Sequence, residues 1–316
     1  MKKIIPTYDD VLRASERIKP FAKKTPVLTS KSINELCNAD IFFKCENFQK
    51  VGAFKFRGAV NAIFSLNDEQ ASKGVATHSS GNHAQALALA ATIRGIPATI
   101  VMPENSSRVK IDAVIGYGAE VVFCQPTLKA RETTLEKVII QKGSTFIHPY
   151  DNYNVIAGAG TSAKELIEEV PNLDYVIAPV GGGGLLSGTS ISVKALLPDA
   201  KVIAAEPEGA DDAFRSLQSG AIVPSLKPNT ICDGLLTSLS ERTFKIISQN
   251  VSEIVTLSDE DTIRAMKLIW ERMKIIVEPS SATALGILLG NKIDLKAKRI
   301  GIILSGGNVD LQKLPW

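Results

Sequence analysis

A lysine between two aromatic residues is the strongest candidate for chemistry in this 316-residue chain. Lys55 lies in the run Phe54-Lys55-Phe56, between Gly52 and Gly58, where a helix is expected to begin. A helical lysine is usually solvated, because its charge is costly to bury. Aromatic neighbours could instead exclude water and lower the pKa of the amine, which makes a lysine nucleophilic and able to form a Schiff base. The local sequence leaves both interpretations open.

A second feature is a run of four glycines, Gly181, Gly182, Gly183 and Gly184, directly before a helix expected from Leu185. One or two glycines would make a tight turn, and each extra glycine costs conformational entropy on folding. Four glycines let backbone N–H groups surround an anion, above all a phosphate, at the positive end of the helix. No Lys-Ser or Lys-Thr pair follows, so this loop is not a nucleotide P-loop.

Two more loops carry polar side chains at the ends of expected strands. The first consists of Ser79, Ser80, Gly81, Asn82 and His83. A helix N-cap needs only one such side chain, so the surplus suits a carboxylate or phenolate ligand, and either serine could carry a proton. His83 lacks a cysteine or aspartate at triad spacing, which favours a structural role. Ser305, in Ser305-Gly306-Gly307-Asn308, either forms a turn or offers one hydroxyl to a ring nitrogen.

A candidate cation site and a possible nucleotide motif complete the polar features. Glu206 and Asp212, with Ala210 between them, place two carboxylates near a backbone carbonyl, a set that can bind a hard cation. On spacing alone, two such acids are more often solvated. The string Gly158-Ala159-Gly160-Thr161-Ser162-Ala163 matches a dinucleotide fingerprint, but turn-forming residues precede it instead of a buried strand. We interpret these glycines as positions of close helix packing.

Short apolar segments alternate with helical patterns along the chain. The expected strands are Ile41–Cys45, Gly74–Ser79, Ala98–Met102, Ala119–Cys124, Thr145–His148, Tyr175–Val180, Lys201–Ala205, Glu253–Leu257 and Arg299–Leu304. Several are apolar throughout, which is typical of parallel strands covered on both faces. Expected helices include Phe54–Leu66, Ala84–Arg94, Leu128–Gln141, Val155–Glu168, Leu185–Leu196 and Glu260–Met273. The alternation predicts open α/β sheets, which bind ligands at the carboxyl ends of their strands.

The composition is that of an ordinary globular protein. At roughly 150 residues per domain, the length predicts about two domains. With 36 basic and 33 acidic residues, the net charge of +3 gives no electrostatic case for binding nucleic acid or a membrane. The basic start, Met1–Thr7, lacks the apolar region of a signal peptide. Four cysteines without a close pair indicate reduced thiols, so we expect a cytoplasmic protein (Cys37, Cys45, Cys124, Cys232).

The order and spacing of these motifs resemble the serine/threonine dehydratase and serine racemase family, pyridoxal-phosphate enzymes with the tryptophan-synthase β fold. The resemblance runs from about Tyr8 to Asp310 and includes Thr25-Pro26-Val27, His148-Pro149-Tyr150-Asp151 and Val277-Glu278-Pro279-Ser280. It implies two open, mostly parallel twisted sheets with helices on both faces. It also implies a large cofactor-binding domain of residues 1–66 and 145–316 and a small inserted domain of residues 67–144.

The resemblance implies roles for individual residues. For the cofactor, they are Lys55 as the Schiff-base lysine, Phe54 beside the ring, Asn82 on the phenolic oxygen, Ser305 on the pyridine nitrogen, and Gly181, Gly182, Gly183, Gly184 and the Leu185 N–H around the phosphate. For the substrate, they are the carboxylate site of Ser79, Ser80, Gly81, Asn82 and His83, the acid–base Ser80 opposite Lys55, and Arg131, where the racemases place a substrate-contacting arginine. For a divalent cation, Mg²⁺ or else Ca²⁺ or Mn²⁺, they are Glu206, Ala210 and Asp212.

The implied activity is that of an ammonia-lyase, which eliminates water from threonine, serine or threo-3-hydroxyaspartate to give a 2-oxo acid and ammonia. The alternative within the family is a serine racemase with dehydratase side activity, and a third hypothesis is a non-catalytic protein that binds a phosphorylated ligand. A homodimer is expected, with a possible nucleotide effector at its interface. Ala53 departs from the serine that many members carry before the Phe-Lys pair, and resembles the hydroxyaspartate dehydratases.

Overall fold

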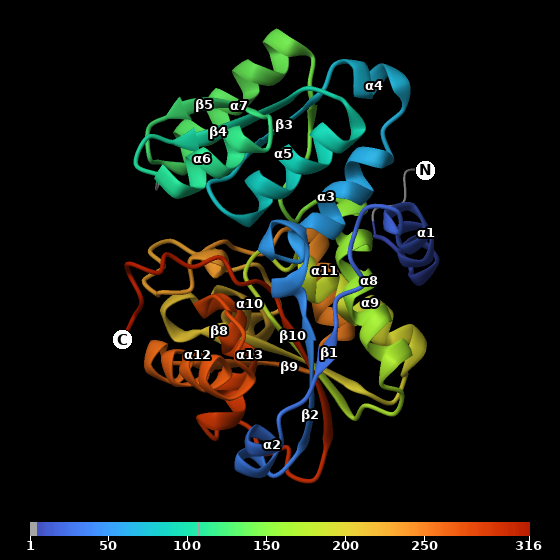
Figure 1. Cartoon of the computed structure of the whole chain (residues 1–316), viewed down its shortest axis with the longest axis vertical. Coiled ribbons are helices and arrows are strands. Elements are labelled where there is room, and N and C mark those ends of the chain that lie inside the picture. The colour runs from blue at the N-terminus through green and yellow to red at the C-terminus, as the bar shows by residue number, and fades with distance from the viewer. Residues whose placement is uncertain (1–4, 107) are drawn as a thin grey trace.

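The computed structural model describes residues 5–106 and 108–316, so Met1–Ile4 of the basic start lie outside the described residues. Figure 1 shows two lobes, each built around one sheet, with helix α3 (Lys55–Phe64) running between them. No helix in these described ranges combines the length and the apolar character that a membrane span requires.

The larger sheet has six strands in the order β1-β2-β10-β7-β8-β9, and only β1 is antiparallel to its neighbour. Its strands are β1 (Val27–Leu28), β2 (Asp40–Cys45), β7 (Tyr175–Pro179), β8 (Lys201–Pro207), β9 (Glu253–Leu257) and β10 (Arg299–Leu304). The central strands are buried almost throughout, as their continuous apolar sequences predict.

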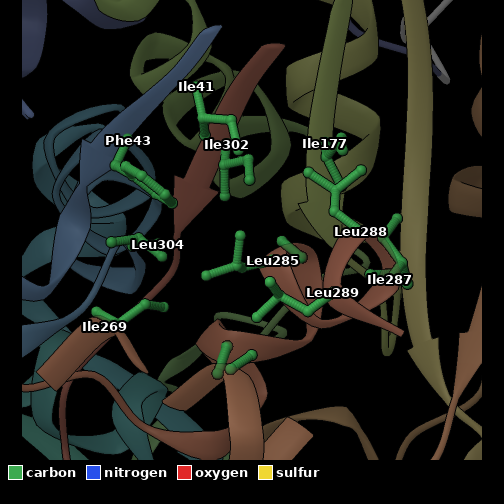
Figure 2. Packing of buried hydrophobic residues seen from close by; sticks show 14 of the residues in the cluster. Ile41, Phe43, Ile177, Ile269, Leu285, Ile287, Leu288, Leu289, Ile302 and Leu304 are labelled. Atoms are coloured by element: carbon green, nitrogen blue, oxygen red, sulfur yellow. The ribbon is translucent and has the colours of Figure 1, made fainter. Parts of the chain in front are cut away.

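Helices cover both faces of this sheet. They are α1 (Tyr8–Ile18), α2 (Lys31–Cys37), α8 (Tyr153–Glu169), α9 (Gly184–Leu196), α10 (Asp212–Ser219), α11 (Glu241–Asn250), α12 (Asp259–Met273) and α13 (Pro279–Leu289). Figure 2 shows the core on one face, where Ile302 and Leu304 of β10 lie near Leu285 of α13. A separate cluster formed by α8, α9 and α11 covers the other face.

The smaller sheet has four parallel strands in the order β5-β4-β3-β6. Its strands are β3 (Val75–His78), β4 (Ala98–Pro103), β5 (Glu120–Cys124) and β6 (Thr145–Phe146). The helices of this lobe are α4 (Asp68–Ser72), α5 (Asn82–Arg94), α6 (Arg108–Gly116) and α7 (Leu128–Lys142). Apolar residues of α5 and α6 pack on one face and those of α7 on the other. In the part of the chain that the structure describes, four short 3-10 turns lie in the loops: η1 (Glu46–Phe48), η2 (Lys50–Gly52), η3 (Glu208–Ala210) and η4 (Asp233–Leu235).

The predicted α/β class, with two mostly parallel sheets covered on both faces, is confirmed. The two-residue strand β1 was not expected, because two residues are too few to show a periodic pattern. The smaller sheet includes β6, one strand beyond the expected boundary at residue 144. The division of the chain into residues 1–66 with 145–316 and residues 67–144 stays a prediction.

Close helix packing holds α3, and with it Lys55, in place. A Cβ atom on Gly158 of α8 would lie 2.6 Å from the carbonyl oxygen of Arg57, and one on Gly160 would lie 2.8 Å from that of Gly188. These glycines therefore serve helix packing, as their sequence context indicates. The buried Arg57 guanidinium also pairs with Glu46 and Glu165 at 2.7 Å, which ties α3 to the end of β2 and to α8.

Candidate active site

Lys55 is the first residue of α3, the helix that runs between the two lobes (Figure 1), and its side chain is half-buried. The amine Nζ donates a hydrogen bond of 2.9 Å to the carbonyl oxygen of Pro149 and lies 5.1 Å from the centre of the Phe54 ring. Burial lowers the pKa of Lys55 from 10.5 to about 8, and the charge of Glu278 opposes this shift. The amine therefore loses its proton more readily than an ordinary lysine, which favours nucleophilic and general-base chemistry.

Of the two aromatic neighbours of Lys55, only Phe54 contributes to the surroundings of the amine. The Phe56 ring is fully buried in the core cluster that α3 and α5 share. Phe54 is held at the end of the larger sheet, because its N–H donates to the carbonyl oxygen of Ser305 at 2.9 Å. Ala53 forms an isolated bridge with Gly306, so the segment before Lys55 and the loop after β10 lie against each other.

The four-glycine loop connects β7 to α9, as predicted. Gly183 is the N-cap of α9 and has a φ of +83°, a left-handed conformation that a residue with a side chain rarely adopts. A Cβ atom on Gly182 would lie 2.4 Å from the Tyr150 ring, and one on Gly181 would lie 2.8 Å from the backbone of Leu235. The first N–H groups of α9 have no carbonyl partner within the helix, so the loop has the donors that an anion needs.

The loop after β3 leads into α5 of the smaller lobe. Ser79 accepts a hydrogen bond of 3.3 Å from the N–H of Gly81, while Ser80 is half-buried. Asn82 begins α5, and its amide donates to the Glu278 carboxylate of the larger lobe at 3.0 and 3.1 Å. His83 is buried and lies 3.1 Å from the Ile147 carbonyl oxygen through Nε2, and burial lowers its pKa to about 3.

Ser305 is the residue that directly follows β10, and it is buried. Its carbonyl oxygen accepts from Phe54, and the following glycine bridges to Ala53. The predicted residues Asn82 and Ser305 thus follow the ends of β3 and β10, and Lys55 begins α3. Hydrogen bonds of Phe54 and Glu278 connect these three segments. Ligand sites of open α/β sheets are expected at such carboxyl ends.

Arg131 lies in the first turn of α7, and its Nε atom is buried without a hydrogen-bond partner among the described residues. Burial and then the charge of Arg131 lower the pKa of His78, the last residue of β3. The His78 ring centre lies 6.3 Å from that of His148, whose Nδ1 accepts from the N–H of Asp151 at 2.9 Å. A guanidinium with a free buried donor is therefore held at the end of the smaller sheet, where it can bind an anion.

The acids expected to bind a cation lie at the end of β8, at a separate turn. Both oxygens of Glu206 accept from backbone N–H groups of α10, at 2.9 Å from Ala213 and 2.8 Å from Phe214. Burial raises the pKa of Glu206 to about 8. Both oxygens of Asp212 are buried without a hydrogen bond of normal geometry; burial raises its pKa to about 6, and the Ser225 side chain only partly opposes this rise. Among the described residues, no three His, Cys, Asp or Glu side chains form a metal-binding group.

Sequence reasoning assigned no role to three residues that shape this site. Glu278 is buried between Asn82 and Asn308, and its N–H donates to the Gly306 carbonyl oxygen at 3.0 Å. Tyr150 packs against Gly182 and Gly184, and Pro149 accepts from Lys55. The sequence motifs that contain these residues, at 148–151 and 277–280, could be recognised. The roles of the three residues could not, because they depend on contacts between residues far apart in the chain.

These residues fit pyridoxal phosphate. The glycine loop offers helix N-terminal donors for a phosphate, and Lys55 is an amine with a lowered pKa. Ser305 at a strand end offers a hydroxyl that suits a ring nitrogen, and Asn82 offers an amide for a phenolic oxygen. These residues therefore offer a suitable partner for the phosphate, the aldehyde, the ring nitrogen and the phenolic oxygen of the cofactor.

Comparisons with known proteins agree with this fit. A family model described as "Pyridoxal-phosphate dependent enzyme" matches residues 18–306. The chain is 53% identical over 312 residues to a beta-hydroxyaspartate dehydratase from Paracoccus denitrificans, covering 99% of both chains. It is 50% identical to an L-threo-3-hydroxyaspartate ammonia-lyase from Saccharomyces cerevisiae, covering 98% of this chain and 95% of that one. A crystal structure of serine racemase from Dictyostelium discoideum is 54% identical, with a TM-score of 0.93 over 97% of this chain and 99% of that chain.

Proposed function

Because this chain belongs to the family of pyridoxal-phosphate dependent enzymes, we propose that it is an ammonia-lyase acting on 3-hydroxy amino acids, with threo-3-hydroxyaspartate preferred over threonine and serine. The reaction removes water across Cα and Cβ, and a later addition of water releases ammonia and leaves a 2-oxo acid. The observation that carries the proposal is the position of Lys55, a half-buried amine that is bound to a backbone carbonyl and has a lowered pKa.

Pyridoxal phosphate, when bound, takes up the negative charge that develops at Cα. Lys55 accepts the Cα proton, because a pKa of about 8 leaves part of the amine unprotonated near neutral pH. Ser80 would face the other side of the cofactor ring from Lys55 and exchange a proton with Cα on that side. The Ser79–His83 loop, which includes the first residues of α5, binds the α-carboxylate of the substrate through its N–H groups. Asn82, Ser305 and the glycine loop orient the cofactor.

Arg131 supports the preference for hydroxyaspartate. Its buried Nε has no partner within the described ranges, and an Arg with a free donor pairs well with a second carboxylate. Ala53, in place of the serine that many members carry, points to the same substrate. The dehydratase from Paracoccus and the ammonia-lyase from yeast, to which the chain is similar, bear names of this activity.

Release of a 2-oxo acid from threo-3-hydroxyaspartate, threonine and serine, assayed separately at equal concentrations, tests the proposal. We expect the largest kcat/KM for hydroxyaspartate, together with stoichiometric ammonia. No 2-oxo acid from any of the three substrates would contradict the lyase assignment.

Serine racemisation is the second candidate, favoured by Ser80 and by the likeness to a structure of serine racemase. Reprotonation of Cα from the Ser80 face would give the D-amino acid. Measuring D-serine and pyruvate formed from L-serine separates the two activities. A Ser80→Ala variant should form no D-serine while it retains part of the elimination, if water can protonate the leaving hydroxyl.

The same proposal includes a divalent cation, most simply Mg²⁺, bound by Glu206, Asp212 and the Ala210 carbonyl oxygen. Two buried acids with raised pKa values support it, because a cation would compensate the charge that burial disfavours. A homodimer, and a nucleotide effector at its interface, are further expectations. Sedimentation velocity measures the oligomeric state, and 2-oxo acid release with and without added nucleotide measures the effector.

A further inference from the structure

Glu278 belongs to a closed hydrogen-bond network that connects the two lobes. Its carboxylate accepts from Nδ2 of Asn82 at 3.0 and 3.1 Å and from the N–H of Asn308 at 3.0 Å. The Nδ2 atom of Asn308 donates to the Val51 carbonyl oxygen at 2.7 Å and to Oδ1 of Asn82 at 2.9 Å. Glu278 is only 3% exposed, so water cannot replace these partners freely.

This network allows only one orientation of the Asn82 amide. A carbonyl oxygen accepts and does not donate, so the Val51 carbonyl requires the NH₂ group of Asn308 on its side. Asn308 therefore offers a donor to Asn82, which must present Oδ1 in return. An ionised carboxylate also only accepts, so Glu278 requires the NH₂ group of Asn82. Both neighbours impose the same orientation, although each acts on a different atom of the amide.

We propose that Glu278 is a positioning residue that holds the NH₂ group of Asn82 ready to donate to the phenolic oxygen of pyridoxal phosphate. An amide nitrogen carries two hydrogens, so Asn82 can bond Glu278 and one further acceptor. Without Glu278, only Asn308 would oppose rotation of the amide, and a rotated amide would present its oxygen to the phenolic oxygen, which would repel it. This inference rests on the proposed position of the cofactor at Asn82.

The hydrogen bonds that Glu278 accepts oppose the effect of its burial. Burial, and next the charge of Asp233, raise its pKa to about 7, while the hydrogen bonds from Asn82 and Asn308 lower it. These donors thus favour the ionised form, which is the form that fixes the amide. A glutamine at this position would keep the shape but offer a single acceptor oxygen to two donors.

The test measures release of pyridoxal phosphate from loaded, full-length enzyme, followed by the cofactor absorbance retained after ultrafiltration at increasing dilution. We compare Asn82→Ala, Glu278→Gln and the double variant in one thermodynamic cycle. Each single variant should weaken cofactor binding about tenfold, the loss expected from one hydrogen bond of about 1.4 kcal/mol. The double variant should bind no more weakly than Asn82→Ala alone, because Glu278 acts through Asn82.

Glu271→Gln, an exposed change of the same chemistry on α12, is the matched control and should bind the cofactor as the wild type does. Should Glu278→Gln fail to fold, Asn308→Ala takes its place in the cycle, since it removes the partner of Asn82 Oδ1. A double variant with multiplied losses, about a hundredfold, would show that Glu278 acts independently of Asn82 and would overturn the inference.

The outcomes also separate this inference from the proposed function. If Asn82→Ala weakens binding and Glu278→Gln does not, only the positioning role of Glu278 fails. If Asn82→Ala itself has no effect, both the inference and the proposed contact of Asn82 are wrong. Neither outcome would test Lys55 as the cofactor lysine, because borohydride reduction and peptide mapping identify that lysine separately.

Discussion

Lys55 is held where its charged form is disfavoured, since burial lowers its pKa from 10.5 to about 8. Between those two values the folded, cofactor-free chain has released the proton while the unfolded chain still holds it. The contribution of Lys55 to stability therefore rises with pH in this range and is lowest below pH 8. The folded chain therefore destabilises the protonated amine at the position where the proposed chemistry needs a neutral one.

It follows that Lys55→Met should stabilise the cofactor-free protein at pH 7, by roughly 1–3 kcal/mol. The gain should shrink as the pH rises above 8 and disappear near 10.5. Urea unfolding of the cofactor-free chains across this pH range measures it. Lys137→Met, at an exposed position of α7, serves as the control and should change stability little at any pH. A gain that does not depend on pH would mean that packing, not charge, is responsible.

Arg131 should distinguish substrates by their charge. Removing one hydrogen bond to a charged group costs about 1.5–3 kcal/mol, or about 10- to 150-fold. Arg131→Ala should therefore lower kcat/KM for hydroxyaspartate by such a factor, and lower that for threonine much less. Lys129→Ala, exposed on the same helical turn, should spare both substrates. Equal losses on hydroxyaspartate and threonine would make Arg131 a structural residue and favour a plain threonine/serine dehydratase.

Residues within recognisable motifs could be predicted from the sequence, while their partners could not. Lys55, Asn82 and the glycines belong to runs whose composition is unusual for a simple turn or helix. The role of Glu278 depends on Asn82, 196 positions earlier in the chain, and no local pattern marks such a contact. Similarly, the sequence cannot show that Arg131 Nε is buried without a partner among residues 5–106 and 108–316, because this depends on how α7 packs.

At the level of elements, the glycine loop has the most specific conformation. A Cβ atom on Gly183 would lie 2.8 Å from side-chain atoms of Leu239 and Ile247, and φ is +83°. Gly183→Ala should therefore weaken cofactor binding tenfold or more, measured as absorbance retained after ultrafiltration. Gly95→Ala is the matched control, because Gly95 has a φ of +72° but no atom near its Cβ. Equal effects of the two changes would indicate backbone strain alone and contradict a role for the loop.

Long, strongly apolar elements could be predicted well, and short or polar ones less well. Strands β9 and β10 occupy the expected residues. In β10 a continuous apolar run is buried in the middle of the sheet, whereas the edge strand β9 keeps a shorter apolar segment with an exposed Glu253 at its start. Strand β6 ends two residues before the expected His148, whose ring instead packs edge-on against Tyr150. Here a tertiary contact replaces the ladder that local β-propensity favours.

For the whole molecule, the two sheets face the site with their carboxyl ends, and the cation turn lies after β8. If Mg²⁺ binds at Glu206 and Asp212, treatment with EDTA should lower the Tm and added Mg²⁺ should restore it. Glu206→Gln should abolish this response, whereas Glu208→Gln, an exposed acid in the same turn, should preserve it. An EDTA-treated enzyme with unchanged Tm and activity would show that the two acids bind no cation.

The most direct test of the central claim is to identify the lysine that binds pyridoxal phosphate. Borohydride reduction of the loaded enzyme fixes the cofactor to its lysine, and peptide mapping by mass spectrometry then locates it. We expect the label on Lys55, with loss of the visible absorbance band and of 2-oxo acid release. A pyridoxyl group on any other lysine, or no label on a chain that still releases 2-oxo acid, would contradict the assignment of this site.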